Sequence, residues 1–261
     1  VSETSMHTNF WFAFLLTAFA GLATAIGSAL AYIAKRTSRG ILAASLGFSA
    51  GVMIYVSFVE LFSEAQRMLS HSYGKVMGGT ITAASFFSGV ILIAVIDFLV
   101  PSYENPHEGG LVEEMGSIAE EHRLKRLGVL TALVIGIHNF PEGIAAFFAG
   151  LTNPTVGISV AAAIALHNIP EGISISIPIY FATGSRQKAF WYSALSGASE
   201  PVGALAGYLA LRPFLSDQLM GFAFAAVAGI MVFIAVDQLV PHAKKYDEGH
   251  ESVYGLIGGM V

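Results

Sequence analysis

The chain has 261 residues, of which 54% are hydrophobic and only 12% are charged, with a formal net charge of −5. Soluble domains carry about 25% charged residues, so a mean hydropathy of +0.66 excludes an ordinary soluble domain and predicts an integral membrane protein. Cysteine is absent, which excludes disulfides and thiolate metal ligands, and no basic, aromatic-rich patch suggests nucleic acid binding.

Apolar stretches of the roughly 20 residues needed to cross a bilayer occur seven times. They are predicted at residues 10–34, 41–62, 79–100, 127–150, 155–182, 189–211 and 217–241. An eighth begins near Ser252, and because ten residues cannot cross a bilayer, we expect the sequence to be cut short there. We therefore predict an all-α polytopic membrane protein with eight transmembrane helices in one domain.

Lysine and arginine predict the orientation of these helices. Ten of the thirteen basic residues follow segments 1, 3, 5 and 7, and three lie on the opposite side. Because basic residues concentrate on the cytoplasmic side, the N-terminus is expected outside the cytoplasm. The longest link, residues 101–122, is predicted to be a cytoplasmic loop. His107 and His122 are expected to be solvated there because they form no spaced cluster, and loose metal binding by them is the alternative.

One motif occurs twice, as VIGIHNFPEGI over residues 134–144 and as AIALHNIPEGI over residues 163–173. Its polar members lie three or four residues apart, which places them on one helix face. The proline before each glutamate removes a backbone donor and is expected to kink the helix and free a carbonyl. Each copy thus offers an imidazole, an amide oxygen, a carboxylate and a carbonyl to a divalent cation; the alternative is a hydrogen-bonded helix contact. The six residues are His138, Asn139, Glu142, His167, Asn168 and Glu171.

Further carboxylates fall within or near the ends of the apolar spans, where a charge costs about 3 kcal/mol at the bilayer centre. Glu200, in the small-residue stretch SGASEP, is predicted to be a ligand or gate, with simple helix packing as the alternative. Glu60 is predicted to be a ligand along the pathway, and for Glu64 a place at its mouth and a purely structural role are both open. Asp97 and Asp237 precede a Leu-Val-Pro at helix ends. Capping or a salt bridge there explains these two residues at least as well as a role in metal binding does.

A second repeat relates the two ends of the chain. GVMIYVSFVELFSEAQR, from Gly51, aligns without gaps on GIMVFIAVDQLVPHAKK, from Gly229, and this places Glu60 opposite Gln238. The two segments would run in opposite directions, so segments 1–3 and 6–8 would be inverted repeats that flank segments 4 and 5. Inverted repeats around a midplane site are a common transporter design.

The ligand types restrict the ion. Imidazole, carboxylate and amide oxygen together suit zinc, Fe(II), manganese, cobalt, nickel or cadmium, whereas magnesium and calcium prefer oxygen ligands alone. Such ligands bind metal in their deprotonated forms, so metal entry is expected to release protons.

The motifs HNFPEG and HNIPEG, the following SGASE, and the segments SFVELFSEA and VDQLVP resemble the ZIP (Zrt/Irt-like) metal transporter family over residues 10–261. The resemblance implies eight helices arranged as three plus two plus three, with both termini outside. It also implies a metal site, often binuclear, between helices 4 and 5. The implied ligands are His138, Asn139, Glu142, His167, Asn168, Glu171, Glu200 and Glu60. The His-Asn pair at positions 167 and 168 resembles that of one branch of the family, whose members are broad-range importers of zinc, iron, manganese, cobalt and cadmium.

The main hypothesis is therefore a divalent metal importer in the bacterial inner membrane. It would work by alternating access, as helices 4 and 5 move at Pro141 and Pro170 against small residues of the flanking segments. The expected partners are metal ions, the lipid bilayer and, in a homodimer, a second copy. The alternatives are a metal-selective channel and a membrane-embedded metal hydrolase; the sequence lacks the HExxH motif typical of many zinc hydrolases.

Overall fold

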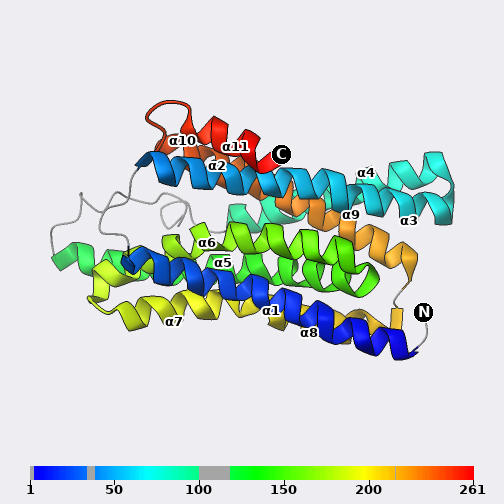
Figure 1. The fold of residues 1–261 in the computed structure, drawn as a ribbon, viewed down its shortest axis with the longest axis horizontal. Coiled ribbons are helices and arrows are strands. Elements are labelled where there is room, and N and C mark those ends of the chain that lie inside the picture. The colour runs from blue at the N-terminus through cyan, green and yellow to red at the C-terminus, as the bar shows by residue number, and fades with distance from the viewer. Residues whose placement is uncertain (1–2, 34–38, 100–117, 215) are drawn as a thin grey trace.

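A computed structural model of the chain describes residues 3–33, 39–99, 118–214 and 216–261. In these residues every regular element is a helix, and the helices run roughly along one long axis as a single bundle (Figure 1). The elements are α1 (Glu3–Ile33), α2 (Arg39–Val56), the π-helical segment η1 (Ser57–Phe62), α3 (Ser63–Tyr73), α4 (Lys75–Leu99), α5 (Ile118–Thr152), α6 (Pro154–Thr183), α7 (Arg186–Gly197), α8 (Ser199–Leu211), the 3₁₀ turn η4 (Arg212–Phe214), α9 (Asp217–Ile234), the π-helical segment η5 (Ala235–Leu239), α10 (Val240–Lys245) and α11 (Glu251–Met260).

Five stretches of the described residues are long and apolar enough to cross a membrane. They are Asn9–Ala29, Arg39–Tyr73, Lys75–Val95, Pro154–Ile177 and Asp217–Lys245. Large apolar side chains cover the outside of the bundle; Phe98 is 87% exposed and Leu209 is 71% exposed. In water such a surface would favour aggregation, so the helices are suited to lipid and the protein is a polytopic membrane protein.

The structure corrects three boundaries that we predicted from the sequence. The helix predicted to end at residue 62 continues to Tyr73, and α5 begins at Ile118, so the last residues of the predicted loop are helical. The span predicted over residues 189–211 is divided into α7 and α8 at Ala198. Pro201 lacks the N–H that would bond to the carbonyl four residues back, at Gly197, and this explains the break.

Two π-helical segments interrupt long helices at matching positions. Helix α2 begins at Arg39 and α9 begins at Asp217, 178 positions later, and both run for 18 residues before a π-helical segment begins. The offset is the same as in the gapless alignment of Gly51 on Gly229. Since a π turn is rare and is often found at functional sites, its recurrence supports structural equivalence of the two segments.

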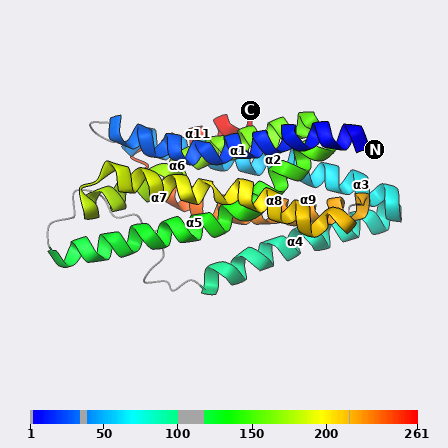
Figure 2. The same ribbon diagram turned by 90° about the horizontal axis from the view of Figure 1, so that it is seen from below.

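Glycines set how the helices pack. Helix α2 packs on α11, α4 packs mainly on α9 and lies along one side of the bundle (Figure 2), α1 packs on α6, and α5 packs on α8. A Cβ added at Gly47 would lie 2.1 Å from the carbonyl oxygen of Ser252 on α11, and one added at Gly229 would lie 2.0 Å from that of Phe86 on α4. The backbones therefore approach so closely that only glycine fits at these crossings.

Candidate metal site

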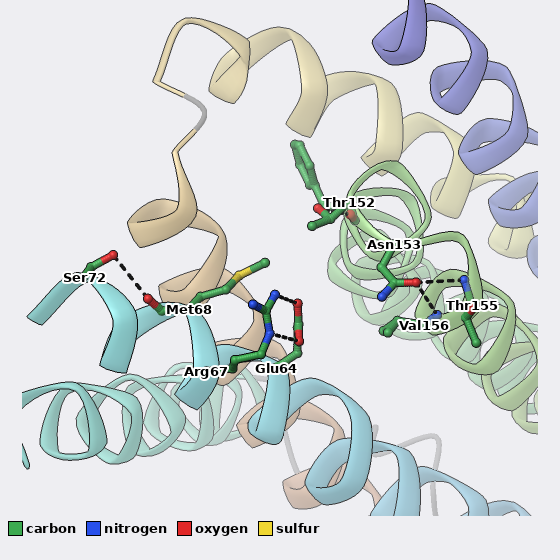
Figure 3. A network of polar contacts seen from close by, with 9 residues as sticks. Glu64, Arg67, Met68, Ser72, Thr152, Asn153, Thr155 and Val156 are labelled. Atoms are coloured by element: carbon green, nitrogen blue, oxygen red, sulfur yellow. Dashed lines mark hydrogen bonds and ion pairs between the residues drawn. The ribbon is translucent and has the colours of Figure 1, made fainter. Parts of the chain in front are cut away.

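Helices α5 and α6 carry both copies of the repeated motif and pack side by side. They are joined at Asn153, whose side-chain oxygen accepts hydrogen bonds from the backbone N–H groups of Thr155 (3.0 Å) and Val156 (3.5 Å) (Figure 3). Pro154 occupies the first helical position, where its missing N–H has no consequence. This cap turns the chain within one residue and makes the two helices antiparallel neighbours.

Both helices remain α-helical through Pro141 and Pro170, so neither proline ends its helix. The carbonyls of Ile137 and Leu166 still lose the hydrogen bond that a proline cannot donate. Helix α5 packs on both α6 and α8, so close packing does not by itself explain why only Pro201 coincides with a break.

His167 is buried on α6 and is held from both sides. Its Nε2 lies 2.8 Å from Oε1 of Glu171, one turn along the same helix. Its Nδ1 lies 3.5 Å from the Oγ of Ser49, a buried residue of α2. A histidine that binds metal through one ring nitrogen is usually oriented by a hydrogen bond to the other, and Ser49 is in a position to do this.

Asn168 links three helices. Its Nδ2 donates to the backbone carbonyl of Ala20 on α1 (2.8 Å) and to Oε1 of Glu200 on α8. Both side chains are completely buried, and Oδ1 of Asn168 and Oε2 of Glu200 have no hydrogen-bond partner among the described residues. Two buried acceptor oxygens without donors are costly and suit a cation.

Asn139 and Glu142 bring the other copy of the motif to the same place. When the Asn139 amide is oriented to donate, its nitrogen lies 3.1 Å from Oε2 of Glu171 and 3.1 Å from the carbonyl oxygen of Ile135. Glu142 is completely buried and lies within electrostatic range of His167 and Glu171. Glu200 is in turn within range of both glutamates, so three buried carboxylates share one region of the interior.

Two predicted ligands are not brought to this cluster by the described contacts. The side chain of His138 lies outside the part of the chain that the structure describes. Glu60 lies on η1 and is half-buried. Among the described side chains, no three from His, Asp or Glu converge closely enough to form a ready-made metal site. The buried groups are instead engaged with one another, as in the His167–Glu171 pair.

The remaining predicted polar residues have local partners. Glu64 forms a two-point ion pair with Arg67 one turn along α3, at 2.8 Å to Nε and 2.5 Å to the terminal nitrogen (Figure 3). Asp97 interacts with the side chain of Gln238 and lies within electrostatic range of Asp237, which connects the end of α4 to η5.

The glycine that follows each motif glutamate has a packing role that we did not predict from the sequence. A Cβ at Gly143 would lie 2.1 Å from the backbone oxygen of Glu200, and a Cβ at Gly172 would lie 1.8 Å from that of Thr24. Each glycine therefore lets a neighbouring helix, α8 or α1, contact the backbone directly beside the motif glutamate. The signal was present, because the glycine follows the glutamate in both copies.

Comparisons with known proteins place this geometry in context. A family model described as ZIP Zinc transporter matches residues 99–261. A protein named zinc transporter ZupT from Nitratidesulfovibrio vulgaris is 60% identical, over 97% of this chain and 94% of its own length. Proteins of the same name from Lysinibacillus sphaericus and Streptococcus mutans are 56% and 51% identical, each over 98% of this chain and 96% of their own length.

Proposed function

The chain belongs to the ZIP family of zinc transporters, and we propose that it imports divalent transition metal ions, zinc among them, by alternating access. Its relatives are named as transporters, so it is classed with transporters and not with enzymes. The proposal extends to a broad metal range that includes iron, manganese, cobalt and cadmium, because imidazole, amide and carboxylate donors suit all of these ions.

One observation carries the proposal of a metal site. Asn168 and Glu200 are joined by a hydrogen bond, and each keeps a buried oxygen without a partner among the described residues. These oxygens lie in a cluster that also holds Glu142, His167 and Glu171. A divalent cation would supply the positive charge that three buried carboxylates require. Its binding would displace any proton held between His167 and Glu171.

We propose that His138, on the neighbouring turn of α5, is a further ligand of this cluster, and that Glu60 acts on the route to it. With six or more donors on α5, α6 and α8, the cluster offers enough groups for two ions. A measurement of the metal-to-protein ratio at saturation distinguishes one bound metal from two.

The packing supports a three-plus-two-plus-three inverted repeat. Exchanging the first three predicted spans with the last three, and α5 with α6, maps the main contacts onto one another. The pair α1 and α6 exchanges with α8 and α5, and the pair α2 and α11 exchanges with α9 and α4. Such internal symmetry lets two alternative packings have similar energy, which alternating access needs. We propose the bacterial inner membrane with the N-terminus outside, as the loop charges favour.

The test is zinc uptake into proteoliposomes by the Glu142→Ala variant. We expect uptake to fall to the level of empty vesicles, because one of the buried carboxylates is lost. The matched control is Glu248→Ala, which removes an exposed carboxylate from the loop before α11. Uptake by Glu142→Ala equal to that of wild type would refute the site. Saturation of the initial rate with zinc concentration distinguishes the carrier from a channel.

A further inference from the structure

A groove of about 440 Å³ lies between α5 and α7 on the surface of the bundle. Val129, Leu133 and Ile137 of α5 form one wall, and Tyr192 and Leu195 of α7 form the other. Leu133 is 58% exposed and Leu195 is 67% exposed. The groove is therefore apolar and open at the surface, within two segments that the sequence predicts to lie in the bilayer.

The groove exists because α5 and α7 do not meet at Gly136. A Cβ added there would have its nearest neighbour, the Oγ of Ser196, 3.8 Å away. Two turns further along α5, Gly143 is in direct contact with the backbone of Glu200 on α8. The inner end of the groove is formed by Phe140 and Ser196, immediately before the helices close together.

Positive charge lies beyond the outer end of the groove. Helices α5 and α7 begin at the same end of the bundle (Figure 1), and α7 carries the exposed residues Arg186 and Lys188 in its first turn. Tyr192 follows Arg186 by six residues, which is about 9 Å along a helix. The sequence has three more basic residues in the first turns of α5, namely Arg123, Lys125 and Arg126.

We propose that the groove binds one acyl chain of an anionic phospholipid, whose head group lies beside Arg186 and Lys188. A charged end about 9 Å from the start of an apolar slot matches the layout of such a lipid. A basic residue near a membrane surface attracts anionic lipid, and two together give roughly a tenfold preference or more over zwitterionic lipid.

The charge beside the groove favours an anionic lipid over an apolar helix of a second copy, because the first turn of α7 carries basic residues and no acidic ones. A bound chain would fill the gap beside Phe140 and Ser196 and so brace α5 against α7, one turn before Glu200. This binding does not depend on which ion is transported.

Tryptophan fluorescence provides the test, because the chain has two tryptophans and one of them, Trp191, lies on α7 beside the groove. Trp11→Phe leaves Trp191 as the only tryptophan. This protein is reconstituted into zwitterionic phosphatidylcholine vesicles that contain a minor fraction of phosphatidylglycerol with brominated chains, which quench tryptophan on contact. A parallel sample contains the same fraction of brominated phosphatidylcholine.

We expect several-fold greater quenching by the anionic lipid than by the zwitterionic lipid at equal fraction. Gly136→Leu, which fills the groove without a backbone clash, should abolish this excess, and Lys188→Gln combined with Arg186→Gln should reduce it. Gly79→Leu on α4 is the matched control, because a Cβ there would lie 3.8 Å from its nearest neighbour, the Nε2 of Gln66 on α3. Gly79 is far from the groove in sequence, so this variant should keep the excess. Equal quenching by both lipids, or an excess that survives in Gly136→Leu, would overturn the proposal.

Discussion

Replacing Gly143 by alanine should disable transport by separating α5 from α8. The new Cβ would lie 2.1 Å from the backbone oxygen of Glu200 and 2.5 Å from its Cα. These are backbone atoms that cannot rotate away, so the two helices must separate by more than 1 Å to reach ordinary contact at 3.4 Å or beyond. Overpacking of this kind costs about 1–3 kcal/mol. The same displacement moves Glu200 relative to Glu142, and a misplacement of about 1 Å can reduce activity by up to about 100-fold.

The assay is the initial rate of zinc uptake into proteoliposomes, normalised to folded protein measured by size-exclusion chromatography. We expect Gly143→Ala to transport at least tenfold more slowly than wild type and to melt at a lower temperature. Gly136→Ala is the control on the same helix, because its Cβ would lie 3.8 Å from the nearest atom. If Gly143→Ala and Gly136→Ala transport equally fast, the argument that a glycine contact positions Glu200 is wrong.

Three further predictions concern single side chains. Ser49→Ala should raise the KM for zinc about tenfold with little change in kcat, because His167 loses the group beside its Nδ1; an unchanged KM in uptake assays would contradict this. Glu200→Gln keeps the hydrogen-bonding shape beside Asn168 but loses a negative charge, so zinc affinity measured by titration calorimetry should fall at least tenfold while the melting temperature stays near that of wild type. Hydrogen bonds from the Ser252 hydroxyl, the Lys244 ammonium and the Glu251 N–H hold the pKa of Asp247 well below its usual range. A lowered pKa stabilises the fold at pH values above the unfolded pKa of about 3.9, and this contribution is lost as the pH falls through the folded pKa. The hydrogen-exchange rate at the start of α11, corrected for intrinsic rates, should therefore stay constant between pH 5 and 7. Asp247→Asn should already exchange faster at pH 7.

Much of the architecture could be predicted because a bilayer permits few kinds of backbone structure. Long apolar stretches had to be helices, since only helices and closed barrels satisfy the backbone in lipid. The turn between the two motif helices was also within reach, because Asn153 followed by Pro154 is a common way to begin a helix. The clustering of Glu142, His167, Glu171 and Glu200 followed from the expense of leaving charges in lipid.

What could not be predicted depends on helix-to-helix contact. Three prolines follow or interrupt the motifs, but only Pro201 coincides with a break, and the sequence around Pro141 and Pro170 does not reveal that those helices continue through the proline. The π-helical segments leave no trace in hydropathy, because one extra residue in a turn changes no composition. Ser49 was missed since a serine in an apolar helix has no periodic signal, and only the packing of α2 on α6 brings it to His167.

The repeat supports a hypothesis about the route of the ion, namely that it approaches the cluster along α2 and η1. Helices α2 and α9 share a backbone pattern, yet their side chains differ at matching positions. On the first lie Ser49, Ser57 and Glu60; at the equivalent places on the second lie Val227, Ala235 and Gln238. At two of these three places a serine of α2 or η1 is replaced by an apolar residue of α9 or η5, whereas Gln238 keeps an oxygen donor and Asp237 lies next to it in the sequence. Of the three polar residues on α2 and η1, Ser49 contacts His167.

Ser57 tests this asymmetry. It is completely buried on η1, and its Oγ has no hydrogen-bond partner among the described residues. Replacing it by alanine removes a buried polar group without breaking a described hydrogen bond, so stability should be unchanged or slightly higher. If the hydroxyl helps a partly dehydrated ion along α2, Ser57→Ala should slow zinc uptake several-fold, whereas Ala235→Ser, which places the same hydroxyl on the repeat-related helix, should not accelerate it. Normal uptake by Ser57→Ala would show that the polar side of the repeat serves packing and leaves the route of the ion elsewhere.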